Sequence, residues 1–98
     1  MTEKFTFNHE LPEGRERELL VILMEECAEV AARCSKALRF GLSEVQPGQP
    51  MTNAQRIGLE LGDLYEVAET MTKEGAIPED AITYGREIKR KKMQVVIS

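Results

Sequence analysis

The chain has 98 residues, of which 42% are hydrophobic, 31% are charged and 5% are aromatic, with a formal net charge of -4 and a pI near 5.1. This acidic balance argues against a protein that binds nucleic-acid polymers, because no excess of positive charge is present to displace counterions from the phosphate backbone. The length fits a single domain over residues 1–98. Because a chain this short buries only about 60 to 65% of the surface that its unfolded form exposes, we expect self-association.

The sequence has neither a run of 18 apolar residues nor the basic and apolar regions of a signal peptide. We therefore expect a cytoplasmic protein with no membrane partner.

Cys27 and Cys34 are seven residues apart in what reads as one helix, so their Cα atoms lie about 10 Å apart, too far for an intrachain disulfide. This spacing is neither CxxC nor a zinc pattern, and we interpret the two cysteines as reduced thiols in the core.

The first long segment, Pro12 to Phe40, is rich in Glu, Leu, Ala and Arg and repeats apolar residues at helical spacing. It predicts a helix that ends at Gly41, which suits a left-handed C-terminal cap. The two prolines and the glycine that follow predict a loop over residues 42–52. Residues 1–11, before the helix, are expected to be irregular.

Two further helices follow the loop. Thr52 and Gln55 have the spacing of a capping box, so a second helix should begin at about Asn53 and stop at Gly75. Pro78 suits the first turn of a third helix, which is expected over about 78–94, with acidic residues at its start and basic residues near its end. The predicted fold class is all-α, a helical bundle of three helices. Because three helices rarely enclose a core alone, we expect dimer or dimer-of-dimers packing to complete it.

Carboxylates lie on the apolar arcs of the first two predicted helices. The arcs are formed by Leu19, Leu20, Leu23, Cys27, Val30, Cys34 and Leu38, and by Ile57, Leu61, Leu64, Val67, Ala68 and Met71. Glu26 and Glu60 fall among these side chains, and Glu29 and Asp63 lie at the borders. Ionised carboxylates are costly to bury without a partner and repel one another. Hard carboxylate oxygens favour Mg²⁺, with Mn²⁺ as a substitute.

The carboxylates allow two other interpretations. Glutamates three or four apart are common on a solvated helix face, and for Glu25 that interpretation is as good as a functional one. It explains Glu26 and Glu60 less well, because both sit among leucines. Zinc, haem or di-iron sites would require His or Cys ligands, and the single histidine, His9, precedes the helices and has no partner at ligand spacing.

The segments 25–29, EECAE, and 60–63, ELGD, together resemble the EExxE and ExxD motifs of the MazG-like all-α nucleoside triphosphate pyrophosphohydrolases. The resemblance covers roughly residues 15 to 92. It implies Mg²⁺-dependent hydrolysis of an NTP or dNTP to the monophosphate and pyrophosphate, in a site between the helices of a dimer or tetramer. Family members commonly remove non-canonical or surplus nucleotides.

The resemblance also implies roles for individual residues. The implied metal ligands are Glu26, Glu29, Glu60 and Asp63. Either Glu25 or Glu29 would orient or deprotonate the attacking water. The basic residues proposed to contact the triphosphate tail are Lys36, Arg86, Lys89 and Lys92. A basic helix end is also typical of a solvated terminus that complements the helix dipole.

The chain departs from the family pattern at two places. Thirty residues separate Glu29 from Glu60, and the loop at 42–52 accounts for the excess, so substrate selection is expected there. The related phosphoribosyl-ATP pyrophosphohydrolases typically have a Tyr-His pair after the aspartate, where residues 64–66 read LYE. That activity is therefore the second choice, and a non-enzymatic helical scaffold or regulator is the third.

Overall fold

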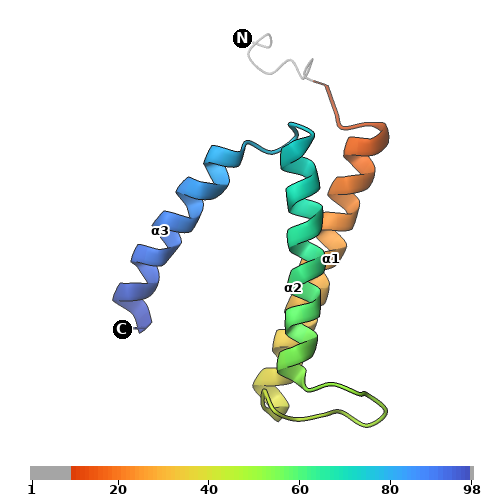
Figure 1. The fold of residues 1–98 in the computed structure, drawn as a ribbon, viewed down its shortest axis with the longest axis vertical. Helices are drawn as coiled ribbons and strands as arrows, with labels where there is room; N and C mark the ends of the chain where they lie inside the picture. Colours follow the sequence, from red (N-terminus) through yellow and green to blue (C-terminus); the bar gives the residue numbers. More distant parts are fainter. Residues whose placement is uncertain (1–9, 98) are drawn as a thin grey trace, which may run out of the picture.

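The protein is described here by a computed structural model that covers residues 10–97, with the side chains of 96 and 97 left out (Figure 1). The described residues form three α-helices and no strand: α1 (Gly14–Phe40), α2 (Asn53–Lys73) and α3 (Glu79–Ile97). The all-α prediction is confirmed. The segment 1–11 that we expected to be irregular lies almost wholly outside the described residues. No described helix combines the length and the apolar character needed to cross a membrane.

The helices α1 and α2 pack side by side as an antiparallel hairpin (Figure 1). The loop between them is held by Asn53, which is only 2% exposed. Its side-chain amide donates to the Gly41 carbonyl at 2.8 Å and to a Glu44 carboxylate oxygen at 3.1 Å. The predicted capping box is present. The backbone N–H of Gln55 donates to Thr52 Oγ1, and the backbone N–H of Thr52 donates to Gln55 Oε1. The loop therefore has a defined shape at one end of the hairpin.

Replacing Asn53 with alanine is expected to destabilise the protein by about 1–3 kcal/mol, because the Gly41 carbonyl then loses a buried donor. Urea unfolding followed by circular dichroism measures the change. Gln49→Ala, at an exposed position in the same loop, is the matched control and should stay within about 0.5 kcal/mol of the wild type. Equal stability of the two variants would show that the Asn53 hydrogen bonds do not hold the loop.

The third helix leaves the hairpin rather than closing a bundle (Figure 1). After α2, Gly75 adopts a positive φ of 82° and Pro78 precedes α3. The radius of gyration is 17.9 Å, against about 13 Å for a compact chain of this length. Of the described side chains only Met71 and Asn53 are fully buried. A single chain thus does not enclose a core of its own.

The apolar arc predicted for α1 is divided in the structure. Leu19, Leu23 and Val30 are half-buried, whereas Leu38 is 88% exposed. The prediction that Cys27 and Cys34 are core thiols is wrong for the single chain, because both are exposed. The physical reason is that a single helix, α2, packs against α1, and it covers only one edge of the broad apolar arc.

Candidate metal centre

Three carboxylates meet where the middle of α1 faces α2. Glu26 comes from α1, and Glu60 and Asp63 come from α2, where a spacing of three residues puts them on one face. One oxygen from each of the three lies within 4.8 Å of the others. Along α1, Glu26 continues the stripe of half-buried Leu19, Leu23 and Val30, so the helix directs it toward α2.

The Glu26 carboxylate is the most constrained member of the cluster. Its Oε2 atom is buried and has no hydrogen-bond partner among the described residues. The pKa of Glu26 is raised above its ordinary value of 4.5, first by desolvation and then by repulsion from Asp63, Glu60, Glu29 and Glu25. Among the described residues, no cationic side chain offsets these effects. The folded chain therefore favours a proton or another cation at this position.

The geometry of the three oxygens fits a hard divalent cation. Opposite ligands of Mg²⁺ are about 4.2 Å apart, twice the usual metal–oxygen distance of about 2.1 Å. Adjacent ligands are about 3 Å apart, so the oxygens of Glu26, Glu60 and Asp63, which lie within 4.8 Å of one another, could bind one cation if their side chains moved closer together. With no His or Cys in the cluster, the donor set is all-oxygen and suits Mg²⁺ or Mn²⁺ rather than zinc.

Glu25 and Glu29 lie beside this cluster but outside it. The Glu29 carboxylate is 3.6 Å from the Arg33 guanidinium, one turn further along α1, and both glutamates are exposed. Their charges still contribute to the raised pKa of Glu26. The ion pair with Arg33 was missed in the sequence, although the spacing of four residues would have shown it. The roles of Glu25 and Glu29 stay predictions.

The basic residues expected to bind phosphate are spread over two helices. Lys36 is half-buried on α1, about 15 Å along the axis from Glu26. Arg86 on α3 lines a groove with the α2 residues Tyr65, Ala68 and Thr72, and not with the three carboxylates. Lys89 is exposed further along α3. A single chain therefore does not bring Arg86 and Lys89 into the carboxylate cluster.

Comparison with known protein families, curated proteins and solved structures finds no match to this chain. The fold and the carboxylate cluster therefore define the chain as an all-α protein with a candidate divalent-cation site. Any assignment of function depends on the two acidic motifs and on this geometry.

Without metal, Glu26→Gln is expected to be more stable than the wild type at neutral pH. A carboxyl group with a raised folded-state pKa contributes stability that is fully present below its unfolded pKa and is lost as the pH rises through the folded-state pKa. Glutamine does not ionise, so the variant does not lose this stability as the pH rises. The difference in stability between Glu26→Gln and the wild type should therefore disappear at acidic pH. Thermal melts in EDTA across this pH range measure it, and a variant less stable than the wild type at neutral pH would contradict it.

Proposed function

We propose that the protein is a Mg²⁺-dependent nucleoside triphosphate pyrophosphohydrolase that converts an NTP or dNTP and water to the monophosphate and pyrophosphate. The observation that carries the proposal is the buried, unpartnered Glu26 Oε2 facing Glu60 and Asp63. The same carboxylates form the EExxE and ExxD pattern that resembles the MazG-like enzymes. Mn²⁺ is the expected substitute for Mg²⁺.

Each residue has a proposed task. Glu26, Glu60 and Asp63 would hold the cation, and Glu29, now paired with Arg33, would be a further ligand. A divalent cation held there would supply positive charge for the phosphate oxygens and a lower pKa for a water molecule bound to it. Either Glu25 or Glu29 accepts a proton from that water. The water oxygen bonds to the α phosphorus, the bond between the α phosphorus and the oxygen that bridges it to the β phosphorus breaks, and pyrophosphate leaves with the electron pair.

The proposed active form is a homodimer or homotetramer. The support is the open shape of the single chain and the scarcity of buried side chains in it. In such an assembly Lys36, Arg86 and Lys89 are the proposed contacts for the triphosphate tail. Removal of surplus or non-canonical nucleotides in the cytoplasm is the proposed role.

Product analysis separates this function from the other two. The purified protein is incubated with canonical and modified NTPs and dNTPs and with phosphoribosyl-ATP, each with Mg²⁺ and with EDTA, and the products are resolved by chromatography. The proposal predicts monophosphate and pyrophosphate from at least one nucleotide only with Mg²⁺. Turnover of phosphoribosyl-ATP alone would favour a phosphoribosyl-ATP pyrophosphohydrolase, and no turnover would favour a non-enzymatic scaffold or regulator.

A further inference from the structure

Charged side chains are matched across one edge of the hairpin formed by α1 and α2. At one end of this edge the Arg15 guanidinium lies 2.7 Å from the Glu74 carboxylate. Further along, a Glu26 oxygen lies within 4.8 Å of an Asp63 oxygen. Arg15 precedes Glu26 by eleven residues. Glu74 follows Asp63 by the same number, so the two antiparallel helices keep one register between these pairs.

The same register places Arg33 across from Arg56. Arg33 follows Glu26 by seven residues on α1. Arg56 precedes Asp63 by seven residues on α2, so both arginines lie about 10 Å from the carboxylates along the hairpin. Seven residues also return a helix to within about 20° of the same face. The edge that carries the carboxylates therefore carries two opposed arginines on the side nearer the loop 42–52.

Neither arginine has its charge balanced by a close carboxylate. Only 23% of the Arg33 side chain is exposed, and its distance of 3.6 Å to Glu29 is long for an ion pair. Arg56 is half-buried, and its Nη1 donates to the neutral Gln46 Oε1 at 3.1 Å. Between residues 10 and 97, no carboxylate forms an ion pair with Arg56. Two half-buried guanidinium groups in this state favour an anion between them.

The edge thus combines a site for a cation with a site for an anion. A polyphosphate that carries a divalent cation fits both, because the cation binds carboxylates and guanidinium groups bind phosphate oxygens. We propose that Arg33 and Arg56 bind the β- and γ-phosphates of the nucleoside triphosphate substrate. The assignment rests on the proposed function, and it directs the triphosphate tail from the carboxylates toward the loop 42–52.

The directions of the two side chains agree with this placement. Side chains on a helix tilt toward its N-terminus, so Arg33 leans toward the carboxylates and Arg56 leans away from them, toward the loop. The contact of Arg33 with Glu29, one turn earlier, and the hydrogen bond of Arg56 to Gln46 in the loop both show these directions. Arg33 therefore spans part of the distance to the carboxylates, and Arg56 lies at the far end of the tail.

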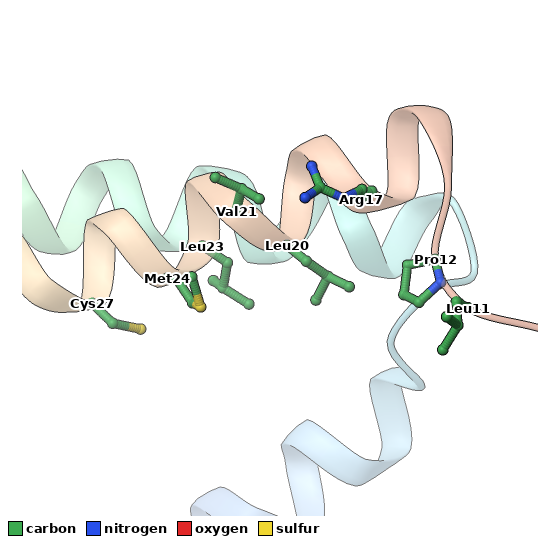
Figure 2. A pocket seen from close by; sticks show the side chains of 8 residues that line it. All are labelled: Leu11, Pro12, Arg17, Leu20, Val21, Leu23, Met24 and Cys27. Carbon is green, nitrogen blue, oxygen red and sulfur yellow. The ribbon is translucent and has the colours of Figure 1, made fainter. Parts of the chain in front are cut away.

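An apolar groove on another face of α1 does not offer a competing site. It has a volume of about 660 Å³, and Figure 2 shows its lining, which includes Leu20, Met24 and Cys27. These three lie at least about 100° around α1 from Glu26. Arg17 is the one charged side chain among the described residues that line the groove, and it lies on the opposite side of α1 from Glu26. It is a matched control, an exposed arginine on the same helix but away from the edge.

Calorimetric titration with inorganic tripolyphosphate in saturating Mg²⁺ tests the assignment. Arg33→Gln and Arg56→Gln should each raise the Kd at least about 10-fold, because each removes charge-assisted hydrogen bonds. Arg17→Gln should change the Kd by less than about 2-fold. Lysine at position 33 or 56 keeps the charge and should lose less affinity than glutamine, and circular dichroism checks that all variants stay helical.

Three results would overturn the assignment: an unchanged Kd in both glutamine variants, an equal loss in Arg17→Gln, or no binding of tripolyphosphate by the wild type. Nucleotide turnover separates its failure from that of the proposed function. Binding that depends on Arg33 and Arg56 in a protein that hydrolyses no nucleotide would keep the anion site and contradict the enzyme. Hydrolysis with the same KM in the wild type and both glutamine variants would keep the enzyme and contradict the anion site.

Discussion

Glu60→Gln is expected to lower Mg²⁺-dependent nucleotide hydrolysis by at least about 100-fold while the protein remains folded and oligomeric. Glu60 supplies one of the three clustered oxygens, and an amide carries no charge to hold a divalent cation. Glutamine has nearly the same shape as glutamate, so the packing of α1 on α2 should be unchanged. Single-turnover kinetics with Mg²⁺ in excess separate a lost chemical step from weaker binding of the nucleotide.

The matched control is Glu66→Gln, which changes an exposed glutamate on the same helix and lies outside the carboxylate cluster. It should retain wild-type turnover. Equal activity of both variants would show that Glu60 does not hold a catalytic cation. Equal loss in both would point to a general effect of charge on α2.

Mg²⁺ is expected to raise the melting temperature of the wild type. A cation that binds only the folded state, at about 100 times its Kd, stabilises by about 2.7 kcal/mol, and for a domain of this size that is about 10 °C or more. Asp63→Asn should lose most of this shift, because it removes one charged ligand. Thermal melts at fixed protein concentration, with Mg²⁺ and with EDTA, measure the shift in melting temperature for the wild type and for Asp63→Asn.

A potassium-salt control at matched ionic strength separates specific binding from screening of the clustered carboxylates. If Asp63→Asn shows the same Mg²⁺ shift as the wild type, the cation binds elsewhere. The absence of any shift in the wild type at saturating Mg²⁺ would contradict a site that includes the buried Glu26.

The helices could be predicted because their signals are local. The Thr52–Gln55 capping box, Gly41 and Gly75 lie close in sequence to the helix ends that they define, and the structure agrees with the sequence there to within a few residues. α1 begins two residues later than expected and α3 runs three residues past 94. Helix ends fray, so shifts of this size are ordinary.

The packing partners were harder to predict. One broad apolar arc on α1 gave no sign that α2 would cover Leu19, Leu23 and Val30 and leave Cys27 and Cys34 exposed. Periodicity states which residues avoid water, but not which helix covers them. A partner for the uncovered edge would have to come from the proposed dimer or tetramer.

The carboxylate cluster was predicted in part. Glu26 and Glu60 could be found because they interrupt apolar stripes, and Asp63 because it borders one; such a stripe faces a neighbouring helix. The position of Arg86 could not be predicted, because it depends on where α3 lies, and α3 makes little contact with the rest of its own chain.

The site proposed between Glu26, Glu60 and Asp63 should hold one divalent cation. Crystals grown with Mn²⁺ and measured near its absorption edge would locate the ion by anomalous scattering. We expect one strong peak between these three side chains, with Glu26 Oε2 as a ligand. A peak only elsewhere, or no peak with the three carboxylates still facing one another, would contradict it.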